Sequence, residues 1–506
     1  MTSNHSTRPV DIHGKPYNPT LIMVTMLLAT FSGVLMQTSL GTALPTLMHD
    51  FDIDFATAQQ ATTWFLLANG VMIPLSAFFA TRFPTKLLHI LAYSILLIGL
   101  AITALAPSSH HYWFVFLVGR IISAVSVGMM MPLMQMLIIN MYPPKKRGVA
   151  MGLTGLAIGL APAIGPTFAG WILDKDHIIL GLTLSNSWRN IFIVPIAVMV
   201  IALVLCIFLM KDIIPNRKLK LDIPSFILSV FGFGLFLWGF SNVASEGWGS
   251  FWWVILPIIA SLFILTFFVV RQLKMKDPFL DLRVFKNRNF TFATLGIVLI
   301  TMAMFGVEMM LPTYLQNIHG FSPLVAGLTL LPGALLMGIT SPISGALYNK
   351  VGVKRLAFVG FFILSVSTIP FAFLSGETST TLITVLYAIR IFSIALIMMP
   401  LTAFAMDSIP TEVGTHGTAV NNTARQMASS IGVALLTSVT QNIINNNEPK
   451  ASLKDTDPFE FMRQFQHAMI DGFNTAFAIG LVFAILGLAL VPFLGNNLSK
   501  ESEETK

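Results

Sequence analysis

The sequence predicts an all-α membrane protein with fourteen transmembrane helices, and two observations lead to that expectation. First, 55% of the 506 residues are hydrophobic and only 10% are charged, whereas a soluble domain is about 25% charged. Second, apolar runs of about 20 residues, the length that crosses a bilayer as a helix, recur along the whole chain. Because the strands of a membrane barrel would give alternating runs of about ten residues, we expect helices.

The expected spans form two groups of six with a pair between them. The first six lie near 21–44, 60–80, 87–106, 112–136, 149–172 and 190–210, the pair near 223–243 and 252–270, and the last six near 291–313, 323–347, 356–374, 381–404, 415–440 and 472–494. The expected domains are a cytoplasmic tail at 1–20, a six-helix bundle at 21–210, inserted helices with linkers at 211–290, a second six-helix bundle at 291–494 and a cytoplasmic tail at 495–506. Residues 1–20 lack the apolar core of a signal peptide.

Lysine and arginine predict the orientation of these spans. With the N-terminus inside, 22 of the 30 basic residues fall in cytoplasmic segments and five in outer segments, while Arg120, Arg390 and Arg425 lie within spans. Cytoplasmic loops of membrane proteins carry this excess of positive charge. We therefore expect both termini on the cytoplasmic side, and the basic composition needs no nucleic-acid partner.

Several classes of site are not expected. Cys206 is the single cysteine, and the adjacent His110 and His111 do not have helical metal-ligand spacing, so neither a disulfide nor a metal centre is predicted. The sequence has no phosphate-binding Gly-x-x-x-x-Gly-Lys-Ser/Thr loop. We expect no cofactor, no enzymatic activity and no requirement for an ATPase subunit.

An internal repeat relates the two bundles. The link from Ser76 to Lys86 and the link from Ser344 to Lys354 both place small residues before a tight basic turn. Arg120, in Arg-Ile-Ile-Ser, and Arg390, in Arg-Ile-Phe-Ser, follow these links at similar distances. Internal repeats of this kind are common in secondary transporters, so the two bundles are expected to be related and the pair at 223–270 to be an insertion.

The fifth expected span carries small residues and prolines at fixed spacing. They are Gly152, Ala161, Gly165, Pro166, Ala169 and Gly170. This pattern is similar to an antiporter signature of Gly, eight residues, Gly, three residues, Gly-Pro, two residues, Gly-Gly, with two glycines replaced by alanine. Together with Gly119-Arg120 and the run from Asn421 to Gln426, it resembles the major facilitator superfamily, in particular its fourteen-spanner drug:proton antiporter branch.

The resemblance covers nearly the whole chain but departs from the family pattern in two places. The first-helix motif of the family usually has an aspartate nine residues before the proline of its Leu-Pro pair, and Met36 occupies that position here. The acidic residue of the link between the second and third helices is Thr81, and Asn349 stands at the repeated position. The resemblance therefore supports fold and export more strongly than it supports the usual proton-binding aspartate.

The resemblance implies proton-coupled efflux of hydrophobic or amphiphilic small molecules, including drugs, across the plasma membrane by alternating access. Its expected partners are a small-molecule substrate, protons and the lipid bilayer. Two other interpretations stay open. One is a dedicated exporter of one metabolite, lipid or signalling molecule, and the other is an uncoupled membrane scaffold or receptor with the same fold.

Charged residues inside spans are the candidates for proton coupling, because a charge at the bilayer centre costs about 2.5–3.5 kcal/mol and usually faces a cavity or a partner. Glu308 is the only acid well inside a core span and is the expected proton site. The competing interpretation is that it reaches the headgroups from about one turn inside the outer end of its helix. Arg120 is expected to face the central cavity and to pair with Glu308 or with a polar group such as Gln37; the competing interpretation is a structural hydrogen-bond donor to helix ends.

Polar residues in the spans are candidates for lining the substrate path. They are Gln37, Asn69, Gln135, Arg390, Asn421, Asn422, Arg425 and Gln426. Several of them form a polar stripe in the thirteenth span, which could equally lock that helix to its neighbours by hydrogen bonds. The motif residues Gly152, Gly165, Pro166 and Gly170 are expected to form a tight, kinked helix contact that seals the pathway during switching.

Overall fold

A computed structural model describes residues 9–495 apart from 54, 156–159, 180–181, 217–221, 277 and 279. Thirteen helices in this part of the chain are long and apolar enough to cross a membrane. The expected fold class, an all-α membrane protein, is confirmed. The remaining one of the fourteen expected spans is the fifth, at 149–172, and it is described as two shorter helices, Pro144–Gly155 and Ala161–Asp174, on either side of the undescribed residues 156–159.

The chain divides into two compact units, which are described separately. The first comprises residues 1–230, 268–284 and 409–422, and the second comprises 231–267, 285–408 and 423–506. Both helices of the inserted pair therefore contribute to both units. The long helix that begins at Gly414 also starts in the first unit and continues in the second.

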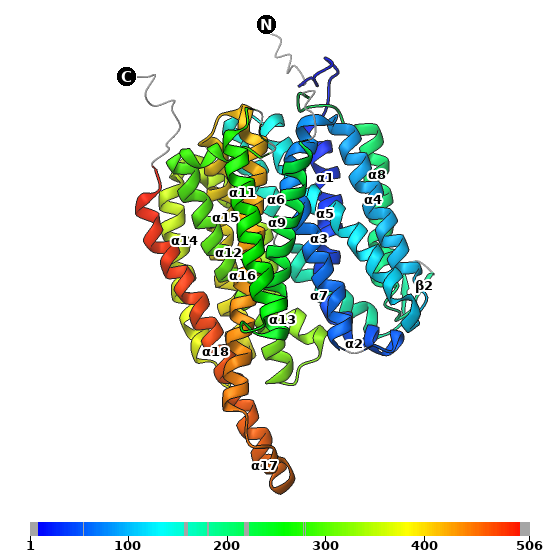
Figure 1. Ribbon diagram of the computed structural model, residues 1–506, viewed down its shortest axis with the longest axis vertical. Coiled ribbons are helices and arrows are strands. Elements are labelled where there is room, and N and C mark those ends of the chain that lie inside the picture. The colour runs from blue at the N-terminus through cyan, green and yellow to red at the C-terminus, as the bar shows by residue number, and fades with distance from the viewer. Residues whose placement is uncertain are drawn as a thin grey trace. The chain divides into compact units, whose positions relative to one another are not determined.

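The first unit is built mainly from the helices that precede residue 210. They are α1 (Pro19–Thr38), α2 (Leu40–Phe51), α3 (Phe55–Arg82), α4 (Thr85–Leu105), α5 (Trp113–Met141), α6 (Pro144–Gly155), α7 (Ala161–Asp174) and α8 (Asn190–Leu209). A two-stranded antiparallel sheet, β1 (His177–Ile179) and β2 (Leu182–Leu184), connects α7 to α8. Figure 1 shows α1, α3, α4, α5 and α8 running side by side. The first expected span is thus broken at Ser39 into α1 and α2.

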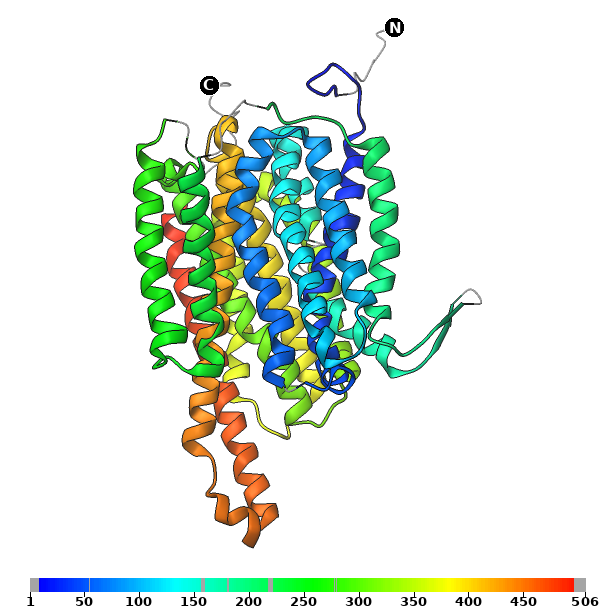
Figure 2. The same cartoon turned by 45° about the vertical axis from the view of Figure 1, so that its right-hand side comes forward.

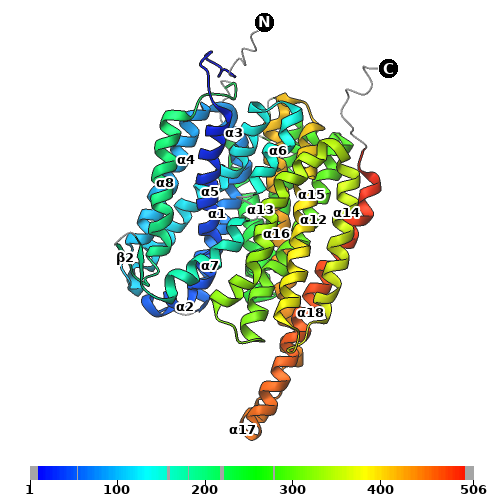
Figure 3. The ribbon, with the colours of Figure 1, turned by 180° about the vertical axis from the view of Figure 1, so that it is seen from behind.

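The second unit holds the helices from α12 onward and part of the inserted pair. The inserted helices are α9 (Ile223–Ser241), the short α10 (Val243–Glu246) and α11 (Leu256–Lys274); they are followed by α12 (Arg288–Asn317), α13 (Pro323–Val351), α14 (Val353–Thr368), α15 (Thr380–Asp407), α16 (Gly414–Asn447), α17 (Ala451–Thr456) and α18 (Pro458–Leu490). Figure 3 shows α12, α14 and α15 side by side.

The two units repeat one pattern of helix packing. In the first, α5 packs against α3 and α4, and α8 packs against α1 and α4. In the second, α15 packs against α13 and α14, and α18 packs against α12 and α14. Small residues allow the closest of these approaches: a Cβ at Gly119 in α5 would overlap the side chain of Thr103 in α4. The repeat expected from the loop motifs is therefore present in the packing.

Three segments expected on the cytoplasmic side meet at one end of the first unit. Asp212, which follows α8, accepts a hydrogen bond from the backbone N–H of Lys86 at 2.9 Å. Its backbone carbonyl accepts another from Ile12 in the N-terminal tail at 3.0 Å. Asn216 donates to the carbonyl of Phe83. The tail, the α3–α4 link and the segment after α8 thus share one side, as the charge distribution requires.

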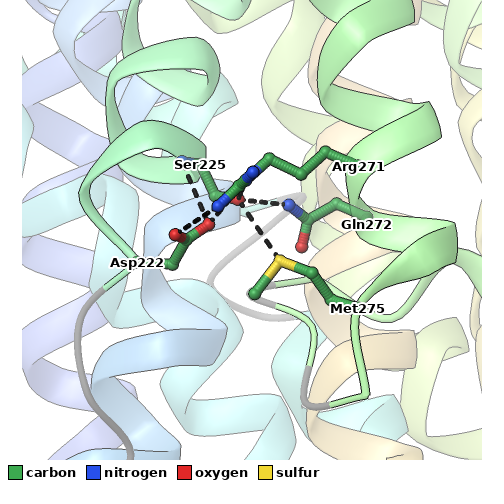
Figure 4. Close-up of polar contacts among 5 residues, drawn as sticks. All are labelled: Asp222, Ser225, Arg271, Gln272 and Met275. Atoms are coloured by element: carbon green, nitrogen blue, oxygen red, sulfur yellow. Dashed lines mark hydrogen bonds and ion pairs between the residues drawn. The ribbon is translucent and has the colours of Figure 1, made fainter.

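The inserted helices are joined by polar contacts where α9 begins and α11 ends (Figure 4). The guanidinium of Arg271 forms a bidentate ion pair with Asp222, at 2.9 and 2.7 Å. Behind it, the buried Gln272 donates to the Ser225 hydroxyl at 2.6 Å and accepts from the backbone N–H of Leu280 at 3.0 Å. Bidentate geometry makes such pairs more specific than ordinary surface ion pairs, so this cluster fixes α9 against α11.

The last two long helices extend beyond the apolar length that a bilayer needs. Figure 2 shows α16 and α18 continuing past the other helices of the second unit and joined by α17. The expected spans in this region were 415–440 and 472–494, whereas α16 runs to Asn447 and α18 begins at Pro458. Pro458 opens α18, and the side chain of Asp457 caps it by accepting from the N–H of Glu460.

Candidate functional site

Glu308 lies deeper in its helix than the sequence indicated. The expected span ended at 313, but α12 continues to Asn317, which places Glu308 about two and a half turns before the helix ends. Its side chain is half-buried. Within the described residues it makes no hydrogen bond, and its electrostatic neighbours are Arg390 and Tyr387 on α15. The position of Glu308 relative to the headgroups stays a prediction, as does its role as the proton site.

Arg390 is fully buried in the second unit and is held by two other helices. Its Nε donates to the hydroxyl of Thr368, at the end of α14, at 3.1 Å. Its Nη2 donates to the backbone carbonyl of Ala303 in α12, the helix that carries Glu308. The guanidinium is therefore held by hydrogen bonds from Nε and Nη2, while its Nη1 amino group has no hydrogen-bond partner among the described residues, although the Glu308 carboxylate is an electrostatic neighbour.

Arg120 has an analogous anchor in the first unit but different surroundings. It is fully buried, and its Nη1 donates to the backbone carbonyl of Met36 in α1 at 3.0 Å. The guanidinium lies over the ring of Phe65 in α3, with 4.2 Å between the guanidinium carbon and the ring centroid. Its Nε and Nη2 find no partner among the described residues. The expected pairing with Gln37 is replaced by the carbonyl of the preceding residue; pairing with Glu308 stays a prediction.

Two of the predicted cavity residues bond to each other. Asn422 in α16 donates from Nδ2 to Oε1 of Gln135 in α5 at 2.7 Å, and both side chains are buried. Because residues 409–422 belong to the first unit, this bond fastens the first two turns of α16 to α5. The adjacent Asn421 is also buried, and its Nδ2 has no hydrogen-bond partner within the described chain.

The rest of the polar stripe in α16 is partly satisfied within the helix. The Thr418 hydroxyl donates to the Gly414 carbonyl and the Ser429 hydroxyl to the Gln426 carbonyl. Arg425 and Gln426 are half-buried. The two interpretations of the stripe both find support, because Asn422 locks the helix while Asn421 holds an unused donor.

Asn69 and Gln37, two other predicted cavity residues, lie in helices of the first unit. Asn69 in α3 is buried, and its backbone carbonyl abuts Gly128 of α5 so closely that a Cβ there would overlap it. Gln37 is half-buried near the end of α1. Their role as substrate contacts stays a prediction.

The switching motif meets the break between α1 and α2. A Cβ on Gly165 would overlap Oγ1 of Thr38 and lie 3.1 Å from the backbone nitrogen of Ser39. Gly165 and Pro166 lie inside α7, and Gly170 is buried in the same helix. Gly152 is buried in α6, on the other side of the undescribed residues 156–159. Only glycine at 165 permits this approach of α7 to the end of α1.

Sequence reasoning missed three groups of this site. Tyr387 lies one turn before Arg390 on α15 and is buried beside Glu308 and Arg390, a spacing that was available in the sequence. Phe65 and the Met36 carbonyl, which hold Arg120, come from distant helices and leave no local signal. In the described residues no cluster of three or more His, Cys, Asp or Glu side chains could hold a metal ion.

Comparison with known proteins identifies the family. The model of the Major Facilitator Superfamily matches residues 26–433. The chain is 41% identical to the uncharacterized MFS-type transporter YcnB of Bacillus subtilis, over 95% of this chain and 96% of that protein. It is 36% identical to the lincomycin resistance protein LmrB of the same organism, over 92% and 94%.

A solved structure shows the same fold. The human organic anion transporter MFSD10 aligns with a TM-score of 0.61 over 92% of this chain and all of that one, at 13% identity. Similarity at this level shows the arrangement of helices alone, while the family model and the relatives that match nearly the full length carry the assignment. The chain is a multi-pass membrane transporter, not an enzyme, and belongs to the Major Facilitator Superfamily.

Proposed function

We propose that this transporter exports hydrophobic or amphiphilic small molecules, including drugs, from the cell in exchange for protons. The observation that carries the proposal is a half-buried carboxylate, Glu308, placed inside a spanning helix beside the buried guanidinium of Arg390. The protein would lie in the plasma membrane with both termini cytoplasmic, as the excess of basic residues in alternate segments supports.

The surroundings of Glu308 suit a group that gains and releases a proton. When ionised, the carboxylate is stabilised by the positive charge of Arg390 in a region of low dielectric; when its oxygen takes up a proton, that attraction is lost. Proton uptake therefore changes the energy of the α12–α15 contact. A conformational change can use such a difference, since a ligand shifts an equilibrium only by its unequal affinity for the two states.

The substrate class rests on the relatives and on the buried amides. LmrB is named for resistance to lincomycin, an observation that favours drug export here. Asn421 offers a buried amide donor without a partner in the described chain, and a polar substrate atom could accept from it. A mostly apolar surround with a few placed polar groups is the usual composition of small-molecule sites.

Glu308→Gln tests the proton site. The substitution keeps the shape of the side chain but removes its ionisable proton, so we expect substrate-dependent proton flux to fall to the background of empty vesicles. The measurement uses purified protein in liposomes that contain a pH-sensitive dye, with ethidium and lincomycin as separate probes. Glu308→Asp should keep coupling in part, because it keeps a carboxylate.

Glu377→Gln is the matched control, because it makes the same chemical change on an exposed loop residue. It should leave proton flux unchanged. Full proton-coupled export by Glu308→Gln would remove Glu308 as the proton site. Export by the unsubstituted protein that ignores a collapse of the proton gradient would overturn antiport itself. Transport of one compound from a broad resistance panel would favour a dedicated exporter.

A further inference from the structure

The antiparallel hairpin between α7 and α8 combines a charged base with an apolar body. Its strands pair His177 with Leu184, Ile178 with Thr183 and Ile179 with Leu182. Asp174, Lys175 and Asp176 precede it and are exposed. From 178 to 182 the sequence reads Ile-Ile-Leu-Gly-Leu, without a charged or polar side chain. A connection that faced only water would have no use for this run, since connecting segments are normally polar.

One face of the hairpin carries the side chains of Ile178 and Thr183, and Ile178 is almost fully exposed. Ile178 is 79% exposed, and its partner Thr183, on the same face, is exposed as well. Burying an isoleucine is worth about 1.5–3 kcal/mol relative to leaving it in water. An exposed isoleucine within a run of five apolar residues therefore indicates a surface that something apolar covers.

The hairpin is attached firmly to the end of α7. The ring of His177 stacks on the indole of Trp171, with centroids 3.9 Å apart and planes 22° apart, and its Nε2 donates to the Trp171 carbonyl at 2.6 Å. At the base, Asp176 accepts from the backbone N–H of Asn186 at 2.8 Å. These contacts fix the direction in which the strands leave the helix.

That direction is sideways and back along the helices. Figure 2 shows the strands leaving the first unit laterally and rising past the end of α8, and Figure 3 places them beside the same ends of α4 and α8. The neighbouring face of α8 is apolar and exposed, with Ile193 at 46% and Ile201 at 57%. In a protein that spans a bilayer, this face contacts lipid. The hairpin thus lies beside an apolar, exposed helix face.

We propose that this hairpin is a membrane-interface anchor that lies in the lipid leaflet at this end of the helices, the outer leaflet in the orientation given above. Ile178 contacts acyl chains, while Asp174 to Asp176 and the Trp171–His177 pair lie among the headgroups. The strands occupy the interface and not the hydrocarbon centre, because each has an unpaired edge whose backbone groups need water or headgroup partners. The proposal does not depend on the substrate or on proton coupling.

A spin label at position 178 tests the proposal. Cys206 is buried and is the only cysteine, so Ile178→Cys is made in a Cys206→Ala background and the labelled full-length protein is reconstituted in liposomes. Ile201→Cys provides the lipid-exposed control. Ser452→Cys provides the water-exposed control, since Ser452 is exposed on α17. Collision rates with oxygen, which partitions into lipid, and with a neutral nickel chelate, which stays in water, are measured for each label.

We expect the label at 178 to collide severalfold less often with the nickel chelate than the label at 452, and as readily with oxygen as the label at 201. Nickel accessibility equal to that at 452 would show that the hairpin stands in water and would overturn the proposal. Protection from both reagents, with dipolar broadening between labels, would show a second copy of the chain on this surface and would overturn it equally.

Discussion

Replacement of Gly165 by alanine should weaken the contact between α7 and the end of α1. The new Cβ would overlap Thr38 Oγ1 and lie within 3.2 Å of both the backbone nitrogen and the hydroxyl of Ser39. Neither hydroxyl can turn away freely, because each donates to the Leu35 carbonyl, at 3.3 and 2.6 Å. The helix must shift or a hydrogen bond must break.

The magnitude follows from these contacts. Overpacking a filled site costs about 1–3 kcal/mol, and a lost neutral hydrogen bond costs about 1 kcal/mol. Alanine gains back about 1 kcal/mol over glycine inside a helix, so Gly165→Ala should be destabilised by about 1–3 kcal/mol. Gly41→Ala, in the adjoining α2, is the matched control: its Cβ meets nothing within 4 Å, so only the helix-propensity gain remains.

The free energy of unfolding, measured in mixed micelles with increasing denaturing detergent, compares the two variants. Gly165→Leu should still insert into the membrane but lose ethidium efflux, because the larger side chain prevents α7 from closing on α1. Gly41→Leu should retain efflux. If Gly165→Ala and Gly41→Ala unfold with the same free energy, the close contact does not contribute to stability as expected. If Gly165→Leu exports normally, the contact is not needed for transport.

Two further predictions concern polar contacts. Hydrogen bonds from Arg271 hold the pKa of Asp222 below its usual 3.8, so this ion pair stabilises the fold above that pH and the contribution is lost as pH falls through the lowered pKa. Asp222→Asn should therefore lower the free energy of unfolding by about 1 kcal/mol at neutral pH and leave it unchanged in strong acid. An equal loss at both pH values would contradict the assignment. The hydrogen bond between Gln135 and Asn422 can be tested with a double-mutant cycle of Gln135→Leu and Asn422→Leu, measured by unfolding in denaturing detergent. The loss of unfolding free energy in the double variant should be smaller, by about 1 kcal/mol, than the sum of the losses in the two single variants. If the losses are strictly additive, the 2.7 Å bond contributes nothing to stability.

The spans were predictable because the bilayer imposes a one-dimensional rule on length and polarity. The same rule explains the errors. The break at Ser39 changes neither composition nor length, so 21–44 looked continuous. Beyond the bilayer the rule no longer applies: the expected span ended near 440, although the asparagine-rich segment from Asn442 to Asn447 continues α16. The hairpin after α7 was missed because two three-residue strands give too short a pattern.

The candidate site was predictable as a set of residues but not as a set of pairs. Arg120, Glu308 and Arg390 stand out because charges inside spans are expensive. Their partners depend on which helix faces lie together, and that information is non-local. Gln135 and Asn422 are 287 positions apart yet share a hydrogen bond, and no spacing rule connects them.

Comparison of the two units shows which features of the buried arginines are shared and which differ. In each unit a buried arginine donates to a backbone carbonyl of another helix. Arg120 of α5 donates to Met36 of α1, and Arg390 of α15 donates to Ala303 of α12. A backbone carbonyl is available whatever the side chain, so this anchor survives substitution at position 36. An acid near the guanidinium is a separate feature: the second unit has Glu308, five residues after Ala303, whereas Met36 of the first unit is uncharged. The proposed proton site therefore belongs to the second repeat, while the backbone anchor of the arginine is common to both.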